Sequence, residues 1–129
     1  MAMNDENGVN FRMRPFTGAA SQVWHFHRVP GTSYYIISST PLEGEMLTVL
    51  RNPALRGQHL ELARISQLFA SNMFDAHWRV VQHSTGYLEI VNRITGRRLD
   101  IDGNNSASGA GVITWPQNNA NNQLWRLVH

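Results

Sequence analysis

Short runs of alternating apolar and polar residues follow one another along almost the whole chain, separated by residues that favour turns. An alternation with a period of two is typical of a β-strand that buries one face. The pattern predicts strands at residues 9–13, 22–29, 34–37, 46–50, 60–65, 77–82, 87–91, 98–101, 112–115 and 123–128. The periodicity of residues 65–74 is ambiguous and also fits a short helical turn. Many short strands predict an all-β barrel or sandwich.

A repeated Trp divides this series of strands into three units. Trp24, Trp78 and Trp125 each close a similar segment and precede a tail in which basic and apolar residues alternate. Their spacing indicates a unit of about 45 residues that carries insertions. We therefore predict one domain, residues 1–129, built of repeats at about 1–30, 31–83 and 84–129. The three Trp residues would take equivalent positions in the core.

The composition excludes several classes of partner. The eleven basic residues are all Arg, the net charge is only +2, and the basic residues are dispersed rather than gathered into a stripe. Nucleic-acid-binding domains usually show such a stripe, so no nucleic-acid partner is expected. No apolar stretch approaches the ~20 residues that cross a bilayer, so no membrane insertion is expected. The N-terminal residues lack a signal-peptide pattern and Cys is absent. These two features predict a cytoplasmic protein, with secretion by a non-signal route as the alternative.

The sequence also lacks the motifs of the common enzyme and metal sites. There is no Cys nucleophile, no Gly-x-Ser-x-Gly and no glycine-rich phosphate loop. Asp100 and Asp102 are close in sequence, but glycoside hydrolysis needs two carboxylates that divide the acid and base roles across a cleft. His25 and His27 would share one strand face without a third ligand at a supporting spacing. We therefore predict no catalysis, no cofactor and no metal.

The last repeat combines several features in a fixed order. Residues 87–93 and 96–101 come first, the Trp115-Pro116 pair follows fifteen residues after Asp100, and Asn122-Gln123-Leu124-Trp125 closes the unit. This order resembles a repeat of the ricin B-chain-like (R-type) lectins, which carry a Gln-x-Trp signature. The resemblance implies a β-trefoil, with three four-stranded units around a pseudo-threefold axis. It also implies shallow sugar sites on the surface of those units, and therefore glycans as partners.

The resemblance assigns roles to individual residues of the third repeat. Asp100 would accept hydrogen bonds from two adjacent sugar hydroxyls, and Trp115 would stack on the apolar face of the sugar. Asn122 would bond one of the same hydroxyls, and Gln123 would orient Asp100 or touch the ligand. The expected carbohydrate-binding residues are thus Asp100, Asp102, Gly103, Asn104, Trp115, Asn122 and Gln123. Galactose or N-acetylgalactosamine fits this set, although Ile113 stands where some members place a polar residue.

The other two repeats lack these residues. In the first, Arg14 replaces the aromatic residue and Ser21 replaces the Asn. In the second, we align Thr48 with the Asp, Ala63 with the aromatic residue and Ala76 with the Asn. One site per chain is therefore expected. A single shallow site usually binds at about millimolar, or ~4 kcal/mol, so useful avidity needs several sites in one assembly.

The first repeat matches only in its second half. Pro15 precedes Trp24 by the same distance as Pro116 precedes Trp125, which supports the alignment. The two opening strands of a complete repeat have no match, so ten strands are predicted where a trefoil has twelve. Missing strands leave unpaired edges, which native proteins cover. We therefore expect either a homo-oligomer or a missing N-terminal segment.

Two other readings remain open on the sequence. The first alternative is a β-trefoil protease inhibitor or protein-interaction module that uses the insert at residues 51–74. The second is a targeting domain that belongs to a larger toxin or glycosidase. One scaffold carries many functions, so the choice depends on the polar and aromatic residues of the third repeat.

Overall fold

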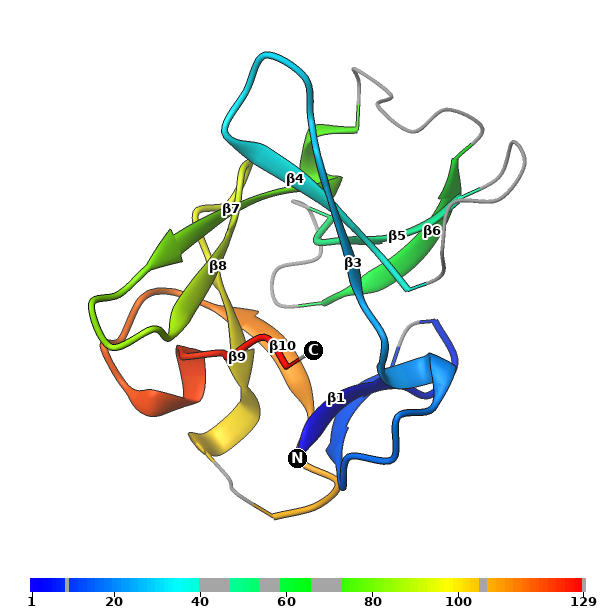
Figure 1. The fold of residues 1–129 in the computed structure, drawn as a ribbon, viewed down its shortest axis with the longest axis vertical. Coiled ribbons are helices and arrows are strands. Elements are labelled where there is room, and N and C mark those ends of the chain that lie inside the picture. The colour runs from blue at the N-terminus through cyan, green and yellow to red at the C-terminus, as the bar shows by residue number, and fades with distance from the viewer. Residues whose placement is uncertain (9, 40–46, 54–58, 66–72, 105–106, 129) are drawn as a thin grey trace.

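The computed structural model describes residues 1–8, 10–39, 47–53, 59–65, 73–104 and 107–128, and these residues form an all-β structure. The strands (Figure 1) are β1 Ala2–Asp5, β2 Phe11–Arg14, β3 His25–Arg28, β4 Tyr34–Ser38, β5 Leu47–Arg51, β6 Glu61–Ile65, β7 His77–Gln82, β8 Leu88–Asn92, β9 Arg98–Ile101 and β10 Val112–Trp115. Within these residues four short 3-10 turns accompany them: η1 Ala20–Gln22, η3 Phe74–Ala76, η4 Asp102–Asn104 and η5 Asn121–Gln123. Among the described residues, no helix has the length and apolar character needed to cross a membrane.

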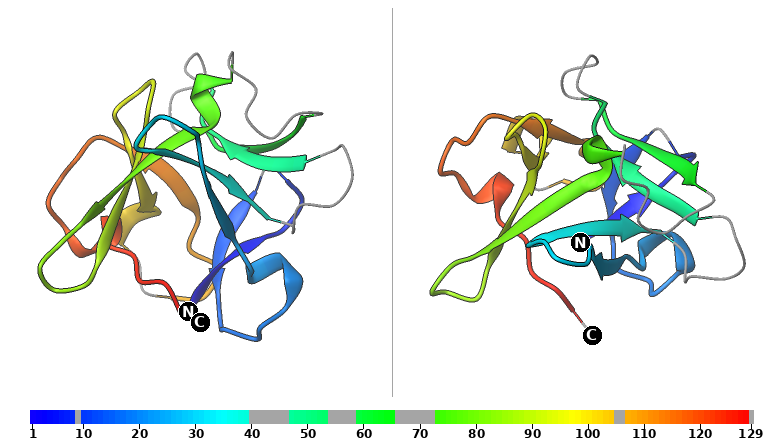
Figure 2. Two further views of the ribbon diagram at one scale, coloured as in Figure 1. Left: turned by 45° about the horizontal axis from the view of Figure 1, so that its top comes forward. Right: turned by 90° about the horizontal axis from the view of Figure 1, so that it is seen from above.

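Three antiparallel hairpins, β1–β2, β5–β6 and β9–β10, are arranged around the centre of the molecule (Figure 1). Between them, β3 pairs with β4, β4 with β7, and β7 with β8, so that consecutive repeats share one curled sheet. A bridge between Leu88 and Trp125 adds the C-terminal segment to β8. Figure 2 shows from two further directions that the β5–β6 hairpin lies away from β8–β10.

The repeated Trp residues hold each repeat in the same way. In each one the indole Nε1–H donates a 3.0 Å hydrogen bond to a carbonyl in the first strand of the hairpin. The three pairs are Trp24 with Met3, Trp78 with Leu50, and Trp125 with Leu99. Trp78 is fully buried, and the other two pack against the same core. The predicted core position of the three Trp residues is confirmed, and their bonds define which residues of the three repeats are equivalent.

The main core follows this equivalence. It contains aliphatic and aromatic side chains from the hairpins and from the inter-repeat strands, packed around the three indoles. These equivalent sets are Met3, Leu50 and Leu99; Phe11, Leu60 and Val112; and Ile37 and Ile90. Each repeat therefore contributes two equivalent apolar positions from its hairpin, which explains why the periodic pattern alone predicts an all-β fold.

The structure differs from the sequence prediction in two places. The first repeat has a strand that the sequence pattern did not show: β1 pairs with β2 in the register that joins β9 to β10. The prediction that both opening strands are missing is therefore wrong for one of them. Only the strand equivalent to β4 and β8 has no counterpart among the described residues before β1. The strand predicted at 123–128 is instead a 3-10 turn, η5, followed by the single bridge at Trp125.

The segment at 65–74, whose periodicity was ambiguous, is described only at its ends. Ile65 ends β6, and Phe74 begins the 3-10 turn η3, so the predicted helical turn between them stays a prediction. Residues 66–72 lie outside the described part of the chain.

Candidate functional site

The β9–β10 hairpin places Asp100 and Trp115 on the same face. Asp100 lies opposite Ile113, and Arg98 lies opposite Trp115. Residues two apart on a strand point to the same side, and directly opposite residues share a side as well. Leu99, between Arg98 and Asp100, points into the core instead. The strand pattern thus turns a carboxylate and an indole toward one region of the surface.

The carboxylate of Asp100 is held at both oxygens. The side chain is only 2% exposed, Asn122 Nδ2 donates to Oδ1 at 3.0 Å, and Gln123 Nε2 donates to Oδ2 at 2.8 Å. Burial raises the pKa of Asp100 above its ordinary value, the bond from Gln123 opposes this rise, and the nearby charge of Asp102 adds to it. Each carboxylate oxygen has two lone pairs, so each oxygen can accept one more hydrogen bond from a ligand.

Gln123 lies beneath Asp100 and holds its carboxylate in place. Its side chain is 1% exposed, and its Nε2 also donates to the carbonyl of Pro116 at 2.9 Å. Its Oε1 accepts a 3.1 Å bond from the backbone N–H of Asn118. Because both ends of the amide are engaged, its orientation is determined and it orients Asp100. The same bonds tie down the loop that follows Trp115.

Above Asp100 lies an open hollow of about 360 Å³. It is lined by Asp100, Asp102, Gly103, Ile113, Trp115, Asn118, Ala120 and Asn122. Trp115 is 42% exposed, so its ring is free to meet a ligand. A carboxylate, an amide and a flat ring around an open hollow can bind vicinal hydroxyls while the ring covers an apolar face.

The structure brings five of the seven predicted residues to this hollow: Asp100, Asp102, Gly103, Trp115 and Asn122. Gln123 lies beneath the hollow and acts on Asp100. Asn104 ends the turn η4, and its side chain lies outside the described part of the structure. Gly103 has a φ of 70°, a left-handed conformation that favours glycine and turns the chain at the edge of the hollow.

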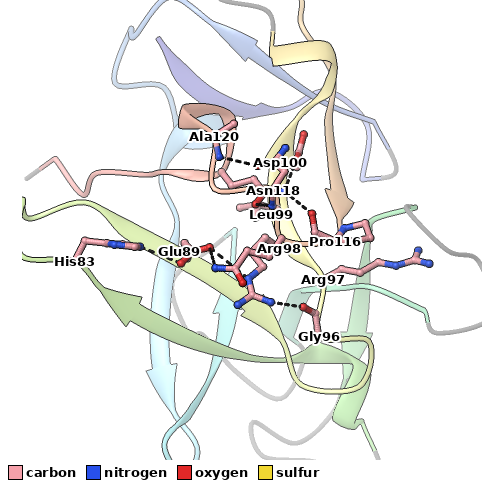
Figure 3. A network of polar contacts seen from close by, with 12 residues as sticks. His83, Glu89, Gly96, Arg97, Arg98, Leu99, Asp100, Pro116, Asn118 and Ala120 are labelled. Carbon is pink, nitrogen blue, oxygen red and sulfur yellow. Dashed lines mark hydrogen bonds and ion pairs between the residues drawn. The ribbon is translucent and has the colours of Figure 1, made fainter.

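Three lining residues, Ile113, Asn118 and Ala120, were not among the predicted binding residues. Asn118 Nδ2 lies 3.3 Å from Asn122 Oδ1, and Asn118 Oδ1 accepts a 2.9 Å bond from the Ala120 N–H (Figure 3). These bonds fold the Asn-rich loop back over Asp100. The position of Asn118 four residues before Asn122 was a usable signal, but nothing in the spacing alone separates it from the other Asn residues of the loop.

The equivalent place in the first repeat has a different set of groups. Asn4 follows Met3 as Asp100 follows Leu99, and it accepts a 2.6 Å hydrogen bond from the Ser21 hydroxyl. Arg14 stands where the third repeat has Trp115, and its Nη2 lies 2.7 Å from Glu6 Oε1. This repeat therefore presents neither a buried carboxylate nor an aromatic ring at the equivalent positions.

In the second repeat the charges are reversed. The equivalent of Asp100 is Arg51, which follows Leu50, so our alignment of Thr48 with the Asp is wrong by three residues. Arg51 Nε donates at 2.9 Å to Oδ2 of Asp75, the residue equivalent to Asn122, and its Nη2 forms an ion pair with the same oxygen. Ala63 stands at the place of Trp115. The carboxylate is thus neutralised by a neighbour, and the stacking ring is absent.

Within the described residues, no three His, Cys, Asp or Glu side chains gather as a metal site requires. His25 and His27 do lie on one face of β3, with ring centres 6.3 Å apart.

The comparisons with known proteins agree with this geometry. The family model described as "Ricin-type beta-trefoil lectin domain-like" matches residues 75–129, which include the whole hollow. The designed threefold-symmetric protein ThreeFoil superposes with a TM-score of 0.77 at 25% identity, over 98% of this chain and 89% of ThreeFoil. The protein is a β-trefoil. This finding confirms the predicted fold class, and the family model confirms the predicted resemblance over residues 75–129.

Two natural toxins share the β-trefoil fold with this chain. A mosquitocidal holotoxin has a TM-score of 0.74 at 17% identity, over 97% of this chain and 15% of the holotoxin. The cytolethal distending toxin of Haemophilus ducreyi has a TM-score of 0.67 at 14% identity, over 98% of this chain and 81% of the toxin chain. At these identities the likeness concerns the fold. No curated protein matches the chain.

Proposed function

We propose that this β-trefoil is a lectin that binds galactose- or N-acetylgalactosamine-type glycans through the hollow of its third repeat, without catalysis. The observation that carries the proposal is the buried carboxylate of Asp100, oriented by Asn122 and Gln123 beside the exposed ring of Trp115. The ricin-type lectin-like match over residues 75–129 supports a carbohydrate ligand.

The chemistry of the hollow suits a sugar with an axial 4-hydroxyl. Two neighbouring hydroxyls can donate to the carboxylate of Asp100, and each hydrogen bond to a charged group contributes roughly 1.5–3 kcal/mol. The opposite, apolar face of such a sugar then meets the indole of Trp115 and is removed from water. Asn122 would accept a hydrogen bond from one of the same hydroxyls at its Oδ1, since the N–H groups of its amide already bond Asp100 and the carbonyl of Ile101.

The proposal includes one site per chain. The reversed ion pair of the second repeat and the Ser21–Asn4 pair of the first leave the third repeat as the one with the full set of groups. A single open site is expected to bind at about millimolar. Self-association, which would multiply such sites, stays a prediction from the sequence, as does the cytoplasmic location.

The absence of catalysis is part of the same proposal. Asp100 is held at both oxygens by neutral amide groups, an arrangement that suits a fixed acceptor of hydrogen bonds. The alternative function, a protease inhibitor or interaction module, depends on residues 51–74, of which 54–58 and 66–72 lie outside the described residues. A role as the targeting domain of a larger toxin or glycosidase is compatible with the same sugar site.

The test compares two single variants on a glycan array and by calorimetry with methyl galactosides. Trp115→Ala removes the stacking ring, and we expect at least about a tenfold loss of affinity. Tyr87→Ala is the matched control, since Tyr87 is a large aromatic residue with almost the same exposure, 41% against 42% for Trp115. It should bind like the wild type. No galactoside binding by the wild type, or equal binding by Trp115→Ala, would overturn the proposal.

A further inference from the structure

A second polar cluster lies next to the hollow, centred on the buried carboxylate of Glu89 in β8. Glu89 is 4% exposed and has three hydrogen-bond partners. His83 Nε2 lies 3.0 Å from Oε2, while Arg98 Nε and Gln117 Nε2 each lie 3.4 Å from Oε1. We refer to His83, Glu89, Arg98 and Gln117 as the Glu89 cluster. Figure 3 shows its His83, Glu89 and Arg98 beside the group around Asp100.

At the junction of the first and second repeats, the equivalent positions hold apolar residues. His83 N donates to Tyr87 O at 2.8 Å as Val29 N donates to Tyr34 O at 2.9 Å, so His83 is equivalent to Val29. Val49 precedes Leu50 as Arg98 precedes Leu99.

The third equivalence comes from the inter-repeat strands. Tyr35 pairs with Trp78 and Leu88 with Trp125, so the following residues, Ile36 and Glu89, are equivalent. Val29, Ile36 and Val49 form a small buried apolar cluster in the structure. The same scaffold therefore accepts either set of residues.

The stability of the fold does not explain why the residues of the Glu89 cluster are polar. Burying a carboxylate and a guanidinium costs desolvation, and replacing such a pair by well-packed apolar side chains is often neutral or stabilising. The second repeat contains that apolar alternative, with Ile36 and Val49 buried to 1% exposure or less. The Glu89 cluster therefore calls for a reason other than packing.

Its position gives the reason. Arg98 lies opposite Trp115 in the hairpin and two residues from Asp100 on the same face of β9. Gln117 follows Trp115 by two residues and is exposed, as is His83. The cluster thus lies beside Trp115 at one edge of the hollow, although its residues are not among those that line it. Arg98 uses Nε and Nη1 in bonds to Glu89 and to the carbonyl of Gly96, which leaves further N–H donors of its guanidinium for a ligand.

We propose that Arg98, Gln117 and His83, held in place by Glu89, bind the second sugar residue of an oligosaccharide whose first residue occupies the hollow. This inference rests on the proposed function and adds that the site recognises a disaccharide or a longer glycan. The opposite charges of Arg98 and Glu89 cancel within the cluster, so the second residue is a neutral, hydroxyl-rich sugar rather than an acidic one.

The experiment measures the ratio of affinities for neutral galactose-terminated disaccharides and for methyl galactoside, by calorimetry on the full chain. We expect the wild type to bind a member of the disaccharide panel about threefold to tenfold more tightly, as one or two additional hydrogen bonds would give. The triple variant His83→Val, Glu89→Ile and Arg98→Val copies the apolar cluster at the junction of the first and second repeats. Its ratio should fall to about one while its melting temperature does not decrease.

The second variant changes a single exposed residue of the Glu89 cluster, Gln117. Gln117→Ala should lower the ratio, whereas Gln82→Ala, at an exposed Gln outside the cluster, should keep the wild-type ratio. The inference is overturned if the wild-type ratio is about one for every neutral disaccharide, if the triple variant keeps the wild-type ratio, or if sialylated glycans bind more tightly than neutral ones. In each case methyl galactoside would still bind. Failure of every sugar to bind would instead overturn the proposed function, and this inference with it.

Discussion

The second and third repeats share one backbone plan and differ in what they place on it. In both, a Trp indole bonds a leucine carbonyl, and the next residue on the strand pairs with a residue of the following 3-10 turn. In the second repeat this pair is Arg51 with Asp75, an ion pair in which Arg51 Nε also lies 3.7 Å from Glu61 Oε1. In the third it is Asp100 with Asn122, a carboxylate with acceptor capacity left for a ligand. This exchanged pair, together with Ala63 in place of Trp115, separates a closed structural contact from a candidate binding site.

The Glu89 cluster and its apolar counterpart extend this contrast. The junction of the first and second repeats holds the aliphatic residues Val29, Ile36 and Val49, whereas the junction of the second and third repeats has charged and polar residues at the equivalent places. The fold depends on the shared apolar positions around the Trp residues. The positions of the Glu89 cluster lie outside that shared set, and there the residues are polar.

The largest effect is expected when the pair of the third repeat is replaced by that of the second. The double variant Asp100→Arg with Asn122→Asp should fold but lose at least about a hundredfold in galactoside affinity, because two charge-assisted hydrogen bonds to the ligand disappear. Calorimetry measures the affinity, and near-ultraviolet circular dichroism checks the fold. A folded double variant that binds like the wild type would show that the pair has no role in recognition.

The pH dependence of binding tests the same carboxylate without a mutation. Burial raises the pKa of Asp100, so the acceptor becomes protonated above the ordinary value of 3.8 and galactoside affinity should fall as the pH approaches that value from above. A raised folded-state pKa means that the folded chain binds the proton more tightly. The contribution of Asp100 to the free energy of unfolding therefore increases as the pH falls through this window. Affinity that stays constant down to pH 3.8 would contradict the assignment.

The smallest effect is expected in the second repeat itself. Asp75→Ala breaks the pair with Arg51, whose side chains are 28% and 16% exposed for Arg51 and Asp75. The free energy of unfolding should decrease by about 1 kcal/mol in urea denaturation, as for partly exposed charge pairs. Galactoside affinity should not change, since the pair lies in another repeat. A clear loss of affinity would mean that the two repeats do not act separately.

Much of the fold was accessible from the sequence because it depends on repeated apolar positions. The three Trp residues, nine of the strands and the Asp100–Trp115–Asn122 set follow from spacing and resemblance. The strand β1 was missed because Ala2–Asp5 is only four residues long, and its partner in pairing is not visible in a local pattern. Arg51 was misaligned because the second repeat carries insertions, and only the bond from Trp78 to Leu50 determines its place.

The polar contacts of the site were harder to predict for a different reason. Asn118 reaches the hollow because its loop folds back on Gln123, and Glu89 belongs to its cluster because three separate segments meet there. In the sequence, Glu89 simply occupies a polar position in an alternating strand. Such contacts depend on the tertiary arrangement of loops, for which periodicity carries no signal.

The most direct test of the sugar site uses the four Trp residues of the chain. Trp24, Trp78 and Trp125 donate their indole N–H groups to backbone carbonyls, whereas Trp115 lies at the hollow with its ring exposed. In a nitrogen-15 correlation spectrum titrated with N-acetylgalactosamine, the indole signal of Trp115 should shift with saturation while the other three stay nearly unchanged. If the indole signal of Trp115 remains in place at tens of millimolar sugar (an order-of-magnitude range set by the expected millimolar affinity), the hollow of the third repeat is not a sugar site.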